Sequence, residues 1–289
     1  MENGTLVLLD GTVADRSRPL LRADDLGALR GDGVFEALLV VDGRPCAFAE
    51  HAARLDRSAA ALGLRAPTPA AWSRCLQLAL ARHGPVDECY ARLVLTRGPE
   101  SGDHCSGYVL VDDLPASTRQ ARAEGVRVVT LPRGTVAPPP EPAPWLLTGA
   151  KTLSYAVNMA AQRWARSQAA EDAVFLAEDG TVLEAPTAAV LLATPDGRLL
   201  SPAPELGILP SIALATLFAT ATRSGWHCSF ARLSLADLRA ADGVWLVSSV
   251  RLAARVRSID GTACGRSRYG QAVDLLVRGL DASAPAPPD

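Results

Sequence analysis

The chain has 289 residues, enough for one large domain or two ordinary ones. Hydrophobic residues make up 48% of it and charged residues 21%, which is typical of a globular protein with a full core. The net charge of −2 at pH 7 gives no general attraction to nucleic acids or anionic membranes, so neither is an expected partner. No apolar run approaches membrane-spanning length, and the six cysteines form no C-x-x-C pair. We therefore expect a cytoplasmic protein with reduced cysteines and no metal site.

In the first 115 residues, strand-like runs and helical patterns predict a small α/β unit. Asp-Gly turn signals follow two of the strand-like runs, and the second turn predicts a hairpin. The expected strands are residues 5–9, 34–41, 44–48, 90–96 and 108–111. The expected helices are residues 50–64 and 70–82.

The rest of the chain begins with a polar stretch, residues 115–124, which we expect to be a linker. The proline-rich run 136–144 cannot form regular structure. Two Asp-Gly turns separate three strand-like runs, which predicts an antiparallel meander and not a βαβ series. Those runs are residues 173–177, 181–193 and 198–202. Helices are expected at residues 152–168, 211–223 and 269–280, with a strand at 244–247.

These patterns predict a mixed α/β (α+β) fold with an uneven division. A small N-terminal α/β domain is expected over residues 1–118, and a larger C-terminal domain over residues 119–281. The final residues, 282–289, are rich in alanine and proline and are expected to be disordered.

Lys151 is the only lysine among the 29 lysines and arginines of the chain. An arginine stays charged, so it can neither form a Schiff base nor take up a proton near neutral pH, whereas a lysine can do both. Lys151 also lies in an apolar stretch, residues 145–157, and burial lowers the pKa of a lysine. This favours a Schiff-base lysine, although the count alone fits a surviving surface lysine equally well.

Tyr155 and Glu184 are candidate partners of the same chemistry. Tyr155 follows Lys151 by four residues, so on a helix the two share a side and the phenol could bond a cofactor oxygen. A core tyrosine is the simpler interpretation. Glu184 shares a face with Val182 by the period of a strand, so it is expected to be buried if Val182 is. A buried carboxylate needs a cationic partner, such as a protonated pyridine nitrogen, but a solvated strand end is an equal alternative.

A phosphate site is indicated where the loop 207–212 leads into a helix, because free amides and the helix dipole suit an anion. Ser211 is more commonly an N-cap in such a place. Ser248 and Ser249, after a strand, could add hydroxyl donors, and Arg54 could add positive charge. Taken singly, strand-end serines and helix arginines usually have no such role.

Arg92 and Arg97 flank an apolar strand, and either could clamp a substrate carboxylate with its planar fork. The segment Gly31-Asp-Gly33 is not a dinucleotide fingerprint, because the third glycine is missing and a strand follows. The chain has no nucleophile elbow, Walker loop or run of metal ligands.

In this order the motifs resemble those of the fold-type IV pyridoxal-phosphate enzymes, which include branched-chain aminotransferases, D-amino acid transaminases and aminodeoxychorismate lyases. The matching motifs are RGDGVFEAL, HAARL, LVLTRG, AKTLSYAVN, DGTVLEAPT, GILPSI, and WLVSS followed by SIDG. They span nearly the whole chain. The resemblance implies a D-amino acid aminotransferase-like fold with a barrel-like larger domain, a homodimer, and pyridoxal 5'-phosphate (PLP) as cofactor.

The resemblance also implies roles for individual residues. Lys151 is then the Schiff-base lysine and catalytic acid/base, Glu184 faces the pyridine nitrogen, and Tyr155 lies near the ring. The implied phosphate ligands are Arg54, the amides of Ile212 and Ala213, and Ser249. The implied substrate-binding residues are Phe35, Arg92, Arg97 and His104.

Some positions depart from the family pattern and bear on the substrate. Gly102 stands where D-amino acid transaminases have the arginine of an Arg-x-His motif, although His104 remains. Phe35 replaces their tyrosine. The segment Ser211–Leu214 lacks the threonine of the family's phosphate loop, and Ala189 replaces a common asparagine. The lysine segment KTLSY resembles that of the lyases.

The leading hypothesis is therefore an aminodeoxychorismate lyase, which releases pyruvate from 4-amino-4-deoxychorismate to give 4-aminobenzoate for folate synthesis. The alternative is a class IV aminotransferase acting on D-amino or branched-chain amino acids. A non-catalytic relative is a minor third interpretation.

Overall fold

The computed structural model describes residues 4–278, so the predicted tail at 282–289 lies outside the described residues. Contacts group Met1–Pro115 with Pro144–Tyr155 as unit 1, and Ala116–Ala143 with Ala156–Asp289 as unit 2. The sequence predicted a single domain boundary at residue 118. The grouping by contacts differs from that prediction in the segment that carries Lys151. That segment belongs to unit 1 because its backbone bonds to a strand there: the Phe35 N–H donates to Lys151 O at 3.1 Å.

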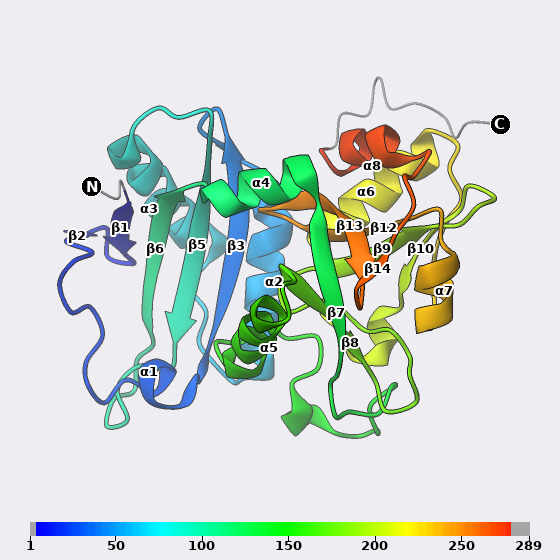
Figure 1. The fold of residues 1–289 in the computed structure, drawn as a ribbon. Helices are drawn as coiled ribbons and strands as arrows, with labels where there is room; N and C mark the ends of the chain where they lie inside the picture. Colours follow the sequence, from blue (N-terminus) through cyan, green and yellow to red (C-terminus); the bar gives the residue numbers. More distant parts are fainter. Residues whose placement is uncertain (1–3, 279–289) are drawn as a thin grey trace. The chain divides into compact units, whose positions relative to one another are not determined.

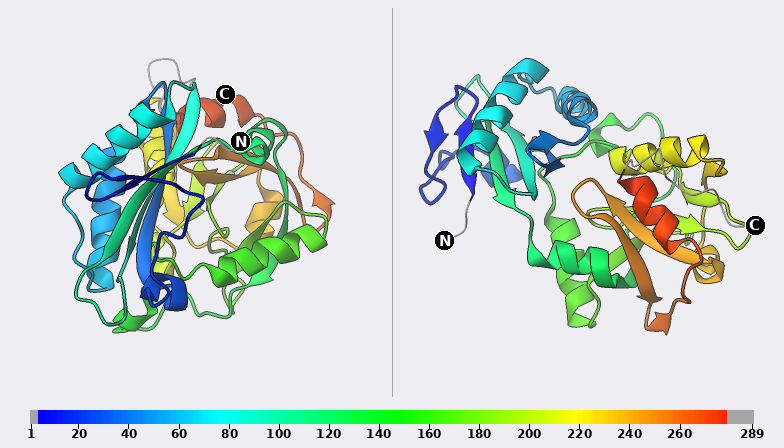
Figure 2. Two further views of the ribbon diagram at one scale, coloured as in Figure 1. Left: turned by 90° about the vertical axis from the view of Figure 1, so that its left-hand side faces the viewer. Right: turned by 90° about the horizontal axis from the view of Figure 1, so that it is seen from above.

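Unit 1 is built on an antiparallel sheet with strand order β2-β1-β6-β5-β3-β4 (Figure 1). Two helices, α2 and α3, cover one face of this sheet (Figure 2). The strands are β1 Thr5–Leu8, β2 Val13–Ala14, β3 Gly33–Val41, β4 Arg44–Pro45, β5 Glu88–Thr96 and β6 Ser106–Asp113. The helices are α1 Leu26–Arg30, α2 Phe48–Ala61 and α3 Pro69–His83, with a 3-10 turn at Pro144–Leu146.

The expected strands and helices of this unit are confirmed, with most ends shifted by one to three residues. The return strand expected at 44–48 stops at Pro45, because the chain turns into α2 at Phe48 through Ala47, whose φ is 51°. The side chains of β3 alternate: Val34 and Leu38 enter the core under the helices, which places Phe35 on the opposite face.

Unit 2 is built on a mixed sheet with strand order β11-β10-β9-β12-β13-β7-β8, and β14 pairs with β13. The strands are β7 Val126–Pro132, β8 Asp172–Leu176, β9 Ala189–Ala193, β10 Leu199–Pro202, β11 Cys228–Ala231, β12 Gly243–Ser248, β13 Leu252–Ile259 and β14 Thr262–Ala263. The helices are α4 Ala116–Glu124, α5 Ala156–Ser167, α6 Ile212–Arg223, α7 Leu235–Ala240 and α8 Gly270–Val277, with a 3-10 turn at Pro204–Leu206. Helices and strands in both units confirm the predicted mixed α/β class.

The predicted linker at 115–124 is wrong, because most of it forms α4. None of the residues of α4 is fully buried, which is consistent with its polar composition. The helix still packs against the rest of unit 2. Ala121 contacts the core, and Arg122 donates to the backbone oxygens of Val250 and Arg251 at 2.7 and 3.1 Å. A helix with an exposed surface can therefore have the same polar composition as a linker.

The predicted meander is also wrong in part. Its antiparallel contacts are present: β9 pairs with β10, and β8 meets residues 181–184 through an antiparallel bridge between Leu176 and Val182. The exclusion of βαβ units is the part that is wrong. Strands β7 and β8 are parallel and flank α5, and β10 and β11 are parallel and flank α6. The expected strand at 181–193 is reduced to β9, because the chain turns at Pro186 and Thr187.

Helix α5 begins at Ala156, four residues later than the expected start at Thr152. The reason is a bridge between Thr152 and Val34 of β3, which holds the preceding residues extended. Lys151 and Tyr155 therefore precede the helix. No described helix is both long and apolar enough to cross a membrane, and residues 4–278 contain no cluster of potential metal ligands.

Candidate functional site

Lys151 is fixed on both sides of its backbone. Its N–H donates to the hydroxyl of the buried Ser58 on α2 at 3.0 Å, and its carbonyl accepts the Phe35 N–H of β3. The side chain is half-buried, and Nζ lies 3.1 Å from the Tyr155 hydroxyl. The predicted pair of amine and phenol is thus present, although an extended segment and not a helix brings the two together.

Aromatic rings surround the same amine. Nζ of Lys151 lies 4.2 Å from the centroid of Phe35 and 5.2 Å from that of Tyr155. The two rings meet edge to face, with centroids 5.1 Å apart. Aromatic faces stabilise a cation and also exclude water, so this setting holds a reactive amine in a defined place. The structure therefore brings together Lys151, Tyr155 and Phe35.

Arg54 lies in a buried charge cluster on the other face of the sheet. Its Nε and Nη2 bind the two oxygens of Glu36 at 2.6 and 2.8 Å, and His51 Nδ1 is 2.7 Å from the same carboxylate. Burial raises the pKa of Glu36, but hydrogen bonds and charges from Arg54 and His51 outweigh this and lower it to about 2. Glu36 is therefore ionised and orients Arg54, whose residue surface is 6% exposed.

Sequence reasoning did not single out Glu36 and His51 individually. A signal existed, because the alternation of β3 places Glu36 on the core face between Val34 and Leu38. A carboxylate at a core position needs a cation, and the His-x-x-Arg spacing on the next helix supplies two basic groups on one side.

Arg92 and Arg97 lie on opposite faces of the sheet in unit 1. Arg92 pairs with Ala37 of β3, two residues along from the Phe35–Val94 pair, so its side chain shares the face of Phe35. It contacts the Tyr90 hydroxyl, and its side chain is 41% exposed.

Arg97 lies beyond the end of β5 on the helix side. Its Nε is 2.6 Å from Asp32, and its Nη2 donates to the carbonyl of Leu62, at the end of α2, at 2.7 Å. The hydrogen bonds to Asp32 raise its pKa. Arg97 therefore connects Asp32, just before β3, to the end of α2 within unit 1. His104, by contrast, has a side chain that is 74% exposed and a contact of 3.4 Å to Asp103.

In unit 2, Glu184 is half-buried and lies in an irregular segment, not at a strand end. Its carboxylate accepts the N–H of Leu209 at 3.3 Å, and its carbonyl accepts the N–H of Phe175 at 2.9 Å. Val182 and Leu183 are both buried, so the expected alternation is interrupted here. Glu184 is thereby tied to the loop that leads into α6.

Helix α6 begins next to this loop. Ser211 is its N-cap, and the Ser211 hydroxyl accepts the N–H of Leu214 at 3.2 Å. The first amides of a helix have no acceptor within it, so those of Ile212 and Ala213 point out of its N-terminus. The first turn contains no acidic residue. An anion is therefore favoured at this end.

Ser249 starts a short turn between β12 and β13. The neighbouring Ser248 uses its hydroxyl to accept the N–H of Arg251 at 3.3 Å. Ser248 therefore stabilises the turn through its hydroxyl oxygen, while its O–H, like that of Ser249, is a donor that suits an anion.

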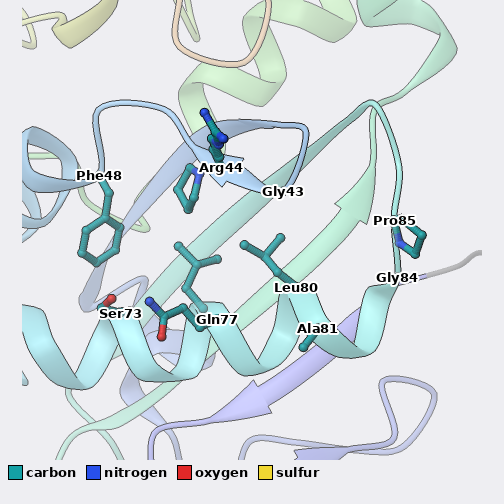
Figure 3. A pocket seen from close by; sticks show the side chains of 11 residues that line it. Gly43, Arg44, Phe48, Ser73, Gln77, Leu80, Ala81, Gly84 and Pro85 are labelled. Carbon is teal, nitrogen blue, oxygen red and sulfur yellow. The ribbon is translucent and has the colours of Figure 1, made fainter.

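Unit 1 also has an open groove with a volume of about 630 Å³, between the β3–β4 turn and α3 (Figure 3). Its lining is mostly apolar and includes Phe48, Leu76 and Leu80, with Arg44 at the hairpin. None of the predicted catalytic, cofactor or substrate residues lines it. The groove therefore does not contribute to the candidate site.

Comparison with known proteins gives consistent matches over most of the chain. The family model described as amino-transferase class IV matches residues 33–259. A bifunctional aminodeoxychorismate lyase / D-amino acid transaminase from Mycobacterium tuberculosis is 42% identical over 94% of this chain and 97% of its own.

Solved structures show the same likeness. A hypothetical aminotransferase from Mycobacterium tuberculosis, in its PLP-bound form, matches with a TM-score of 0.93 and 43% identity over 96% of this chain and 99% of its own. A fold IV transaminase from Curtobacterium pusillum matches with a TM-score of 0.90 and 36% identity over 97% of this chain and 99% of its own.

Proposed function

Because the chain belongs to the amino-transferase class IV family, we propose that it is a PLP-dependent aminodeoxychorismate lyase that also transaminates D-amino acids. The lyase reaction converts 4-amino-4-deoxychorismate into pyruvate and 4-aminobenzoate. The observation that carries the proposal is the setting of Lys151, whose backbone is fixed at both ends and whose amine lies 3.1 Å from a phenol. The name of the 42% identical relative combines both activities.

The residues of each unit fit the parts of PLP. In unit 1, Lys151 supplies the amine that binds an aldehyde, and Arg54 supplies a buried guanidinium for the phosphate. In unit 2, Glu184 supplies a carboxylate for the pyridine nitrogen. The Ile212 and Ala213 amides and Ser249 supply further phosphate donors.

PLP, when bound, withdraws electrons from the substrate carbon that carries the amino group. Lys151 Nζ removes the proton from that carbon. Tyr155 accepts a hydrogen bond from Nζ and so aims it, while the Phe35 ring limits access of water. Glu184, held by the Leu209 amide, keeps negative charge in place for the pyridine nitrogen. The two activities share this proton removal. In the lyase reaction the bond to the enolpyruvyl oxygen then breaks and the leaving group takes up a proton to become pyruvate. In transamination no such bond breaks, and Lys151 returns the proton.

Arg92 is the arginine we assign to a substrate carboxylate. It shares the face of Phe35, two residue pairs along the strands, which is a separation of about 7 Å. Arg97 lies on the other face and is bound to Asp32 and Leu62. His104 has an exposed side chain close to Asp103, and we keep it as a proposed substrate-binding residue.

We further propose a cytoplasmic homodimer that acts in folate synthesis, as the family resemblance implies. Light scattering tests the dimer, since it is expected to give a mass twice that of the 30.3 kDa chain. A monomer in solution that is fully active would contradict this part.

The test of function compares two assays on one preparation. We expect release of pyruvate and 4-aminobenzoate from aminodeoxychorismate, and slower transfer from D-alanine to 2-oxoglutarate, both abolished in Lys151→Ala. Transfer without lyase turnover would leave the class IV aminotransferase as the function. If the folded protein takes up no added PLP, the non-catalytic alternative is correct.

A further inference from the structure

Arg251 connects two turns of unit 2, the one that follows Glu184 and the one that begins at Ser249. Its Nη1 is 2.8 Å from Asp172 Oδ2, and its Nη2 donates to the Thr187 hydroxyl at 3.2 Å. Thr187 lies in the turn directly after Glu184, and Arg251 itself belongs to the turn that begins at Ser249. One guanidinium thus spans the distance between these two turns.

The Ser249 turn is also fixed from its own backbone. Arg122 of α4 donates to the carbonyls of Val250 and Arg251 at 2.7 and 3.1 Å. The turn ends at Leu252, whose φ of 62° is in the left-handed region that a leucine adopts only at a cost. These hydrogen bonds compensate that cost, so the turn has one defined conformation.

The charge pair holds the Arg251 side chain in one orientation. Asp172 is 1% exposed and the Arg251 side chain is 15% exposed. A buried carboxylate that loses its cation is strongly unfavourable, so the guanidinium cannot swing away from Asp172. The planar fork then directs its second nitrogen at Thr187. A lysine could satisfy Asp172, but it lacks the planar fork that presents separate nitrogens to Asp172 and Thr187.

We propose that Arg251 is a positioning residue that sets Ser249 relative to Glu184, so that both meet the rigid cofactor at once. Arg251 does not touch the cofactor in this role. The inference rests on the proposed function, because Glu184 and Ser249 are proposed there as cofactor contacts. A displacement of either turn weakens binding, since ligand groups must be held to a fraction of an ångström.

The test measures the equilibrium dissociation constant of PLP for the apoprotein by absorbance titration, together with the thermal midpoint of the apoprotein. Arg251→Lys keeps a cation for Asp172, and Thr187→Val replaces the hydroxyl of an exposed residue with a methyl group of similar size. We expect the constant to rise roughly tenfold in each, with little change in the midpoint. Thr187→Ser, which keeps the hydroxyl, and Arg198→Met, which removes an exposed arginine paired with Asp196, are expected to bind as the wild type does.

The outcomes separate the two proposals. Wild-type apoprotein that binds no PLP refutes the proposed function. If the wild type binds PLP and both Arg251→Lys and Thr187→Val bind it equally well, the function stands and the positioning role is wrong. A lower thermal midpoint with unchanged PLP affinity means that Arg251 is purely structural, which also overturns the inference.

Discussion

The Glu36 carboxylate is buried, yet its pKa is lowered to about 2 because Arg54 and His51 stabilise the charged form. A lowered pKa means that the folded state binds this proton less tightly than the unfolded state does. The stabilisation is therefore complete above the ordinary value of 4.5 and is lost as the pH falls towards 2.

We accordingly expect Glu36→Gln to lower the free energy of unfolding by about 3 kcal/mol at pH 7, because Arg54 is then left buried without its counter-charge. The difference from the wild type is expected to shrink as the pH falls below 4.5. Urea unfolding at several pH values measures this. Asp196→Asn, at an exposed ion pair, is the control and is expected to change little. A deficit that is independent of pH would contradict the charge argument.

The two arginines of the β5 region are expected to respond differently to substitution. Arg92→Ala is expected to raise the KM for the substrate by at least about tenfold, because the substrate carboxylate loses its charged partner. The thermal midpoint is expected to change little, because the Arg92 side chain is partly exposed. Arg97→Ala is expected to lower the midpoint, because Asp32 and the Leu62 carbonyl lose their donor. Steady-state kinetics and thermal unfolding of both variants check this, and the reverse pattern would assign the carboxylate to Arg97.

At the residue scale, the sequence singled out Lys151 by its uniqueness and predicted that Tyr155 lies beside it, which the structure confirms at 3.1 Å, although the helix assumed for that spacing is absent. It could not choose between Arg92 and Arg97, because that choice depends on which face of the sheet each occupies. It also did not identify Arg251, whose partners Asp172 and Thr187 are 79 and 64 residues away in the chain. Contacts of that separation leave no local pattern.

At the element scale, periodicity predicted the long helices α2, α3 and α6 and the strands β3 and β5 well. It did not predict the start of α5. The run after Lys151 has helical composition, but backbone hydrogen bonds to β3 keep its first residues extended. Tertiary contacts can override local preference in this way, and the same applies to the polar helix α4.

The extended Lys151 segment depends on one side chain of α2. Ser58 is 2% exposed, and its hydroxyl accepts the Lys151 N–H. Ser58→Ala leaves that amide without its acceptor, so we expect a loss of about 1–2 kcal/mol of stability. Faster hydrogen exchange at the Lys151 amide is the specific measurement. Ser73→Ala on α3 is the matched control, and equal exchange in the two variants would show that Ser58 does not hold the segment.

At the scale of the whole molecule, contacts assign Lys151 to unit 1 although α5, which follows within five residues, belongs to unit 2. Composition predicted a division of the chain but could not predict that the chain returns to unit 1 for twelve residues, Pro144–Tyr155. That return depends on the pairing with β3 and so on long-range contacts.

The composition of the whole chain also makes its amine chemistry unusually simple to test. With Lys151 as the only lysine, the one other primary amine is the chain's N-terminus. Borohydride makes the link between an amine and a bound aldehyde permanent, so treatment with PLP and borohydride is expected to add one cofactor per chain. Intact mass and peptide mapping measure the number and the position, which we expect to be Lys151.

The matched variant is Lys151→Arg, which keeps a cation beside the two rings but cannot form the link. We expect this variant to retain its fold, as judged by circular dichroism, and to lose the label completely. A label that persists in Lys151→Arg would place the reactive amine at the N-terminus. The aromatic setting of Lys151 would then be structural, because a cation over Phe35 stabilises the segment whether or not it reacts.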